Sequence, residues 1–504
     1  MIILNKKTWN FFFDSNNKIY YAGLELKNFI QNKKYICKKN LIQQLKYINS
    51  QYGLIVENGD NILAFTDCVS SYPLIYGWIG NRFLLSDNIF NFKYNKINQI
   101  AKEEIISCGY TLDNKTIFQN IKWVKPNNIF NKIKNKIYLK NNNLSHKFNY
   151  NKPIFELKNL HSELFKDCIK NLNNRTAVIP LSAGLDSRLI LTGLLSHNYK
   201  KIVTFSYGPK NHYEIKAAKK ICSYLGIKNI QVYTKINDVK KFYKSDLLKK
   251  YSKFYDTGTN ALNFQDIYPL YLIRNQIPRN SVIINGQTGD FISGGHLPIN
   301  IKKIKNKEFY NKMYEKFCNL WISHKIKPPK NIVINNLIKL TKKEKTYEKK
   351  WTQFELINRN AKYILSGQRA YELLGYDWLL PLWNKKYVNF WLNCPVNLKI
   401  RQNLYKKVLV MQNYCNIWKD NKWYFKKYDS PLWARLIRFL FKKILSHFVS
   451  NVVCKYYENK FFLYFTSNLR GMAYKKYFDI IKSKHFFRNE LSFLAEDYIK
   501  KHDI

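Results

Sequence analysis

The residues of this sequence that are best suited to chemistry lie in the segment PLSAGLDSR at residues 180–188. Ser182 and Ser187 offer hydroxyl donors, and Gly184 permits close approach of the backbone to a phosphate. Asp186 has the oxygen chemistry to hold a magnesium ion that bridges phosphate oxygens. The segment is not a Walker A loop, because GxxxxGK[ST] is absent. Two interpretations stay open: a phosphate-binding turn, or an ordinary strand-to-helix turn that Asp186 caps.

The elements around this turn alternate between apolar strand-like runs and helix-like runs. Such alternation predicts a parallel α/β sheet, and a helix start after a strand directs backbone N–H groups at an anion. The predicted strands lie at residues 176–181, 201–205 and 230–233, and the predicted helices at residues 154–172, 188–195 and 213–225.

The first part of the chain has short β-type runs broken by Asn, Gly and Asp, which predicts antiparallel sheets. These runs lie at residues 52–56, 61–65, 74–76, 82–85 and 116–118. Apolar periodicity lapses near residues 148–155. We therefore expect three parts: a β-rich domain at residues 1–150, a parallel α/β domain at residues 151–425 and a helical basic C-terminal extension at residues 426–504.

The turn at residues 180–188 resembles the SGGxDS pyrophosphate loop of ATP pyrophosphatases, and its surroundings resemble asparagine synthetase. Ser182, Gly184, Asp186 and Ser187 match the loop, while Ala183 replaces its second glycine. That replacement is tolerable only where φ stays negative. Further segments resemble the family in the same order, at residues 204–208 with Glu214, 281–290, 372–382, 388–395 and 405–409.

The resemblance implies the fold and the roles of the site residues. It implies an N-terminal Ntn-hydrolase-like α/β/β/α sandwich, followed by an adenine nucleotide α-hydrolase-like parallel sheet with helical C-terminal additions. Asp186 and Asp290 would share Mg²⁺ on ATP, and Lys406 would neutralise charge at the α-phosphate, so these three form the expected catalytic set. Phe291 stands where the family has an acidic partner of Asp290. The expected nucleotide-binding residues are Leu181, Ser182, Gly184, Asp186, Ser187, Tyr207, Asn285 and Gly286.

The first domain resembles the class II glutaminase half of the same family. Asp67 and residues 70–76, 85–87 and 109–118 carry this resemblance. In that class the nucleophile is a cysteine exposed as the mature N-terminus, whereas this chain begins with Met1 and its first cysteine is Cys37. We therefore expect a degenerate glutaminase domain, with nitrogen supplied by free ammonia, by a partner glutaminase or by an amine on the acceptor.

Composition adds expectations about partners and location. The net charge of +51 comes from basic residues scattered along the whole length, which favours compositional bias over a specific nucleic-acid partner. Nine widely spaced cysteines without a CxxC pair predict reduced thiols, and no histidine spacing indicates a transition metal. No secretion signal is evident, so we expect a cytoplasmic protein, for which a homodimer is compatible with the sequence.

The C-terminal extension has a basic amphipathic stretch at residues 432–453. We expect a core or lid helix there; the alternative is peripheral contact with the inner membrane face.

These observations together predict an asparagine synthetase-like ligase. It would adenylate a small-molecule carboxylate, aspartate or a related acid, form an amide and release AMP and pyrophosphate, without its own glutaminase activity. Three alternatives remain: a non-catalytic scaffold, favoured by Ala183 and Phe291; an amidotransferase acting on a uronic acid of a surface polysaccharide; and, ranked lower, an RNA-modifying enzyme.

Overall fold

The computed structural model describes residues 1–32, 37–92, 96–141, 148–208, 210, 212–318, 330–423, 436, 439–440 and 490–502. The amphipathic stretch at residues 432–453 lies, apart from Leu436, Phe439 and Leu440, outside these described residues. Among the helices that the structure describes, none combines the length and the apolar character needed to cross a bilayer.

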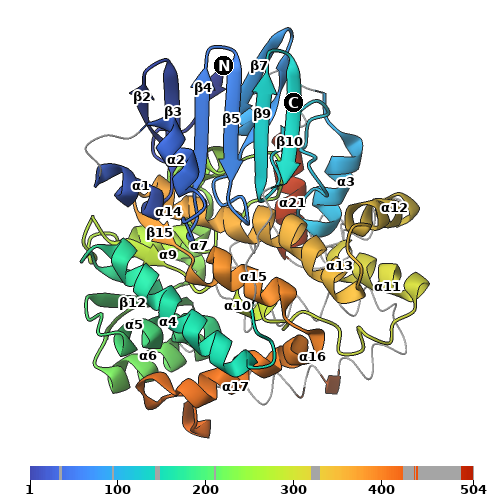
Figure 1. Ribbon diagram of the computed structural model, residues 1–504. Coiled ribbons are helices and arrows are strands. Elements are labelled where there is room, and N and C mark those ends of the chain that lie inside the picture. The colour runs from blue at the N-terminus through green and yellow to red at the C-terminus, as the bar shows by residue number, and fades with distance from the viewer. Residues whose placement is uncertain are drawn as a thin grey trace.

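Two sheets form the N-terminal part of the molecule (Figure 1). The larger is antiparallel, in the order β10-β9-β5-β4-β3-β2. Its strands are β2 (Asn10–Asp14), β3 (Asn17–Ala22), β4 (Gly53–Asn58), β5 (Asn61–Thr66), β9 (Asn128–Ile133) and β10 (Lys136–Asn141). The smaller sheet has the order β1-β7-β6-β8, from β1 (Ile2–Ile3), β6 (Ile75–Ile79), β7 (Arg82–Ser86) and β8 (Lys122–Trp123).

Alternation of side chains along the strands builds the layers of this part. Ile55 of β4 packs in the same core as Tyr76 of β6, between the two sheets. Leu54 and Val56 point the other way, into a core shared with α1 (Leu24–Gln31) and α2 (Lys38–Gln44). On the opposite side, α3 (Gln99–Cys108) covers the smaller sheet. The result is the α/β/β/α sandwich that was predicted.

The strand expected at residues 116–118 is absent; these residues form a loop in which Phe118 makes only an isolated antiparallel bridge with Ile97. Thr116 folds its hydroxyl back onto the carbonyl groups of Phe118 and Ile121. The N–H of Ile117 donates to Gly258 O instead of pairing with a neighbouring strand. The β-type composition of this segment thus reflects burial against the second half of the chain.

The second half is built on a five-stranded parallel sheet in the order β13-β12-β11-β14-β15. Its strands are β11 (Ala177–Pro180), β12 (Ile202–Gly208), β13 (Lys228–Tyr233), β14 (Val282–Ile284) and β15 (Asp377–Leu379). The chain leaves β11 towards one edge and returns at β14 on the other side of β11. Ligands bind outside the carboxyl ends of strands at such a switch point.

Helices surround the parallel sheet (Figure 1). Those of the βα units are α4 (Pro153–Leu172), α5 (Leu185–Ser196) and α6 (Tyr213–Leu225). Between β13 and β15 lie α7 (Ile236–Tyr243), α8 (Asp246–Phe254), α9 (Ile267–Ile273), α10 (Gly289–Ile292), α11 (Asn306–Met313), α12 (Lys330–Thr341), α13 (Tyr347–Phe354), the π-helical segment η3 (Glu355–Ile364) and α14 (Arg369–Leu373). After β15 come α15 (Lys385–Asn393), α16 (Val396–Lys399), α17 (Asn403–Gln412) and α21 (Glu490–Lys500).

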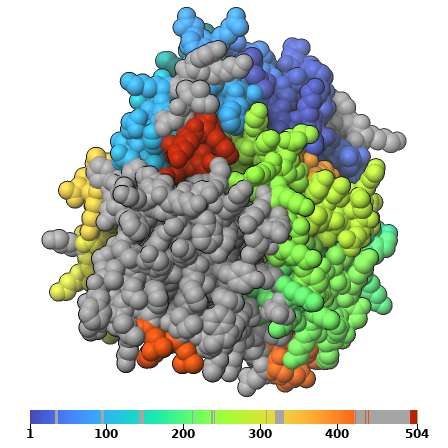
Figure 2. All heavy atoms as spheres, turned by 180° about the vertical axis from the view of Figure 1, so that it is seen from behind, coloured from blue at the N-terminus to red at the C-terminus, as the bar shows by residue number. Residues whose placement is uncertain are grey.

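Buried polar contacts join the two halves. Arg369 of α14 lies 3.1 Å from Asp87 just after β7, and both side chains are about 1% exposed. The segment 490–502, red in Figure 2, lies between the blue N-terminal region and the green part of the chain. There Tyr498 and His502 both bind the carboxylate of Asp256, at 2.8 Å and 2.9 Å.

Candidate active site

The turn between β11 and α5 is held in shape by its own serines. Ser187 Oγ accepts the N–H of Ser182 at 3.1 Å, and Ser182 Oγ accepts the N–H of Gly184 at 3.1 Å. Ala183 does not have a positive φ, so the methyl group in place of a glycine causes no backbone strain. The first N–H groups of α5 follow directly, and a helix start carries partial positive charge.

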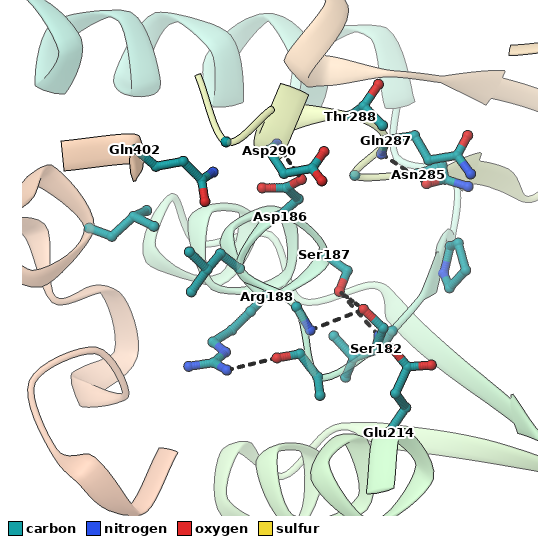
Figure 3. Close-up of a pocket in the computed structure, with 18 of the residues that line it drawn as sticks. Ser182, Asp186, Ser187, Arg188, Glu214, Asn285, Gln287, Thr288, Asp290 and Gln402 are labelled. Carbon is teal, nitrogen blue, oxygen red and sulfur yellow. Dashed lines mark hydrogen bonds between the residues drawn. The ribbon is translucent and has the colours of Figure 1, made fainter. Parts of the chain in front are cut away.

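Asp186 and Asp290 lie side by side after the adjacent strands β11 and β14 (Figure 3). The backbone N–H of Asp290 donates to Asp186 Oδ2 at 2.8 Å, and the hydroxyl of Tyr405 on α17 donates to Asp186 Oδ1 at 2.9 Å. Gly286 packs directly on the backbone at the start of α5, where a Cβ atom would lie 2.7 Å from Ser187 N, and a Cβ atom at Gly289 would lie 2.7 Å from the carboxylate oxygen Asp186 Oδ1. Close backbone packing therefore brings the two carboxylates together.

Ionisation of Asp186 beside Asp290 is unfavourable in this buried position. Burial, and then the negative charge of Asp290, raise the pKa of Asp186 to about 7. A divalent cation between the two groups would remove that cost, and Mg²⁺ prefers carboxylate and phosphate oxygens. The donor set therefore fits a magnesium ion shared with a phosphate ligand.

A histidine that the sequence analysis did not select borders the pair. His296 Nε2 lies 3.3 Å from Asp290 Oδ2, and His296 Nδ1 lies 2.5 Å from Oε1 of the buried Glu355. Arg359 donates to the same Glu355 oxygen at 2.8 Å. Burial lowers the pKa of His296, but its hydrogen bonds to both carboxylates and their charges outweigh burial and raise the pKa to about 9. Burial likewise opposes ionisation of Asp290, yet the hydrogen bond and charge of His296 hold its pKa below the usual value.

A second polar network lies at the ends of β12 and β14. The hydroxyl of Tyr207 donates to Asp266 Oδ1 at 2.6 Å, and Asn285 Nδ2 lies 3.3 Å from Asp266 Oδ2. Asn285 also donates to the hydroxyl of Tyr371 at 2.8 Å, and Tyr371 in turn donates to Asp266. Burial raises the pKa of Asp266. Tyr207 thus faces the cavity with its side chain already fixed.

Cationic side chains reach the cavity beside α17 and α5. Lys406 Nζ donates to the carbonyl of Arg401 at 3.0 Å. Arg188 donates to the carbonyl of Ala183 at 3.2 Å, and its guanidinium lies 5.1 Å from the centre of the Trp418 ring. These contacts place positive charge on the same side as the loop of Ser182 and Ser187.

One cavity of about 1170 Å³ contains all the residues that the sequence analysis selected. They are Leu181, Ser182, Gly184, Asp186, Ser187, Tyr207, Asn285, Gly286, Asp290 and Lys406. His296, Asp266 and Gln402 also line the cavity. These three residues and Tyr405 were not predicted from the sequence. Two of these had a signal in the sequence: His296 follows a Gly-Gly pair soon after Asp290, and Tyr405 directly precedes Lys406.

Phe291, at the position of the expected acidic partner, is 3% exposed and lies against Trp383, with 5.9 Å between ring centres. It therefore supplies packing and no ligand. Its place beside Asp290 is taken by the imidazole of His296.

Residues 163–414 match the family described as asparagine synthase. A search among proteins of curated function found no match. The matched segment spans half of the 504 residues and includes every residue selected for the site. Members of this family are ATP-dependent, amide-forming ligases that use a carboxylate substrate, and this chain belongs to the asparagine synthase family.

Proposed function

We propose that this protein adenylates a carboxylate with ATP and then converts the acyl-adenylate into an amide. A carboxylate oxygen attacks the α-phosphorus, the bond to the β-phosphate oxygen breaks, and pyrophosphate leaves. An amine nitrogen then attacks the acyl carbon and loses a proton, and AMP leaves with the bond electrons. The single observation that carries this proposal is the contact of Asp186 with Asp290 beside the serine turn in one large cavity.

The residues divide into a phosphate end and a nucleoside end. Ser182, Gly184 and Ser187, with the start of α5, would bind the pyrophosphate group through hydroxyl and N–H donors. Leu181, Tyr207, Asn285 and Gly286, at the ends of adjacent strands, would bind the nucleoside.

Asp186 and Asp290 would hold the magnesium ion, which when bound neutralises the phosphate oxygens. Lys406 adds a cation at the same site, where negative charge builds up on the leaving pyrophosphate. In this assignment Tyr405 orients Asp186, and His296 orients Asp290.

We propose that the sandwich of residues 1–150 has no glutaminase activity and that residues 151–425 carry the ligase, followed by the extension of residues 426–504. Cys68, in the sandwich, is buried, and burial and the charge of Asp67 raise the pKa of its thiol. Asp67 itself is used to accept the N–H groups of Tyr52, Val69 and Ser71. The nitrogen would then come from ammonia, a partner glutaminase or an acceptor amine.

The test is pyrophosphate release from ATP with Mg²⁺ and ammonium, using L-aspartate and D-glucuronate as separate carboxylates. We expect release that depends on one of these carboxylates and that falls at least 100-fold in Asp186→Asn and Asp290→Asn. Lys134→Gly, in the distant β9–β10 hairpin, is the control that keeps wild-type turnover.

Two further outcomes separate the alternatives. Absence of carboxylate-dependent release with every acid tried would favour a non-catalytic scaffold, which the packing of Phe291 in place of an acidic residue also favours. Glutamine should fail where ammonium succeeds, and ammonia release from glutamine by the purified chain would contradict the assignment of the sandwich.

A further inference from the structure

Gln402 precedes α17, and its side chain points into the cavity towards Asp186 and Asp290 (Figure 3). Its contact with Ser293 fixes which way the amide faces. Ser293 Oγ lies 2.6 Å from the carbonyl oxygen of Gly289, which can only accept, so the Ser293 proton is donated there. Ser293 Oγ then accepts from Gln402 Nε2 at 2.9 Å. The amide oxygen, Gln402 Oε1, is therefore the atom left for the cavity.

Three groups that accept hydrogen bonds thus face one part of the cavity: two carboxylates and an amide oxygen. None of the three can donate to another when both aspartates are ionised. The carboxylates already accept hydrogen bonds from Tyr405, the N–H of Asp290 and His296, and a cation would satisfy the lone pairs that remain on all three groups. A neutral amide oxygen suits a magnesium ion that already meets two carboxylates and a triphosphate, because it adds a ligand without adding negative charge.

We propose that Gln402 Oε1 is a third protein oxygen ligand of the magnesium ion, beside Asp186 and Asp290. This assignment rests on the proposed function, in which the two aspartates hold that ion. Gln402 belongs to a different part of the chain from either aspartate, so the metal would join α5, α10 and the start of α17 when ATP binds.

The backbone at Gln402 is held in a conformation that its residue type disfavours. Arg401 and Gln402 are consecutive residues with φ of 59° and 60°. Left-handed conformations of non-glycine residues persist where the surroundings fix them, and they gather at ligand sites. Here the neighbouring loop approaches so closely that a Cβ at Gly295 would lie 3.2 Å from Gln402 Cδ. A glycine at position 402 would relieve the conformation and remove only the side chain.

The test measures metal binding without turnover. The probe is α,β-methylene-ATP, and the quantity is the free Mg²⁺ concentration that gives half-maximal nucleotide binding by calorimetry. We expect this concentration to rise roughly 10-fold in Gln402→Met and in Gln402→Gly, since each loses one ligand. Gln402→Glu keeps an oxygen at the same place and should bind Mg²⁺ at least as tightly as wild type.

Two controls separate metal binding from folding. The thermal midpoint of Gln402→Gly should be no lower than that of wild type, because glycine accepts a positive φ without strain. Lys134→Gly makes the same change at φ 50°, far from the cavity, and should keep wild-type Mg²⁺ dependence.

Three results overturn the assignment in different ways. If the free Mg²⁺ concentration for half-maximal nucleotide binding in Gln402→Met and in Gln402→Gly stays within twofold of the wild-type value, the amide is not a ligand. If Gln402→Glu binds Mg²⁺ as weakly as Gln402→Met, the hydrogen bond to Ser293, and not the side-chain oxygen at position 402, supports Mg²⁺ binding. Nucleotide binding that does not depend on Mg²⁺ in the wild type and that is unchanged in Asp186→Asn would refute the proposed function itself.

Discussion

The hydroxyl of Tyr405 favours the ionised form of Asp186 at neutral pH. It donates to Asp186 Oδ1 at 2.9 Å, where burial and the charge of Asp290 already raise the pKa of Asp186 to about 7. A hydrogen bond to a charged group contributes about 1.5–3 kcal/mol. Its loss in Tyr405→Phe should therefore raise the pKa of Asp186 to roughly 8–9 in the absence of metal.

The expected loss of metal affinity follows from the ionised fraction of Asp186. With a pKa of about 7, half of the wild-type carboxyl groups are ionised at pH 7. In Tyr405→Phe the fraction falls to roughly 1–10%. The free Mg²⁺ concentration for half-maximal binding of α,β-methylene-ATP should thus rise roughly 5- to 50-fold at pH 7. The difference should disappear as pH approaches roughly 10, where both proteins are ionised.

Tyr387→Phe is the matched control, because Tyr387 is equally buried and close enough to Asp186 to interact with its charge, but its ring stacks on His161 and its hydroxyl donates to neither aspartate. It should keep wild-type Mg²⁺ dependence at every pH. A defect in Tyr405→Phe that is the same at pH 7 and pH 10 would refute ionisation of Asp186 as the cause. No defect at either pH would show that Asp186 does not hold the metal.

Three further changes test the packing around the site. Glu355→Gln removes the buried charged partner of His296 and should lower the free energy of unfolding by about 3 kcal/mol, measured by urea titration at pH 7. The pKa of His296, measured by NMR, should also fall. Arg369→Met leaves Asp87 as an unpaired buried charge and should cost about 3–5 kcal/mol by the same measurement, whereas an unchanged midpoint would contradict the pairing. Burial lowers the pKa of Lys362 to about 7 in the folded protein. Between pH 7 and about 10.5 the amine is therefore protonated in the unfolded chain and neutral in the folded protein. Wild-type stability relative to Lys362→Met should therefore rise across that window, by at most about 1.4 kcal/mol per pH unit, and a flat difference would contradict burial of the amine.

The parts of the site that could be predicted from sequence are those that follow directly from a strand. Ser182 to Ser187 and Asn285 to Asp290 each continue a strand of the parallel sheet, so their spacing in the sequence already determines their position. His296 and Gln402 were not predictable in this way. Their partners, Glu355 and Ser293, lie 59 and 109 residues away in the chain, and only the packing of helices brings them together.

The fold shows the same division. The short β-type runs at β4 and β5 predicted antiparallel sheets, whereas the sandwich was implied by the family resemblance. In the structure one face of each of these strands meets the other sheet and the other face meets helices. The same apolar, β-branched composition misled at residues 116–118. There Ile117 is fully buried, and its backbone N–H bonds to Gly258 from the second half of the chain. Composition indicates burial, and a strand follows only where a neighbouring strand is available.

The π-helical segment η3 explains why a sandwich without glutaminase activity would be retained. On one side, Asn358 Oδ1 accepts the N–H of Asp113, and Lys362 donates to the carbonyl groups of Thr111 and Asp113 in the sandwich. On the other side, Glu355 holds His296 at the cavity. A helix with wide turns aims these side chains in both directions, and such helices are frequent at functional sites. Because the same ten residues join both halves, a displaced sandwich would move the support of His296, and with it Asp290, whether or not any glutamine is hydrolysed.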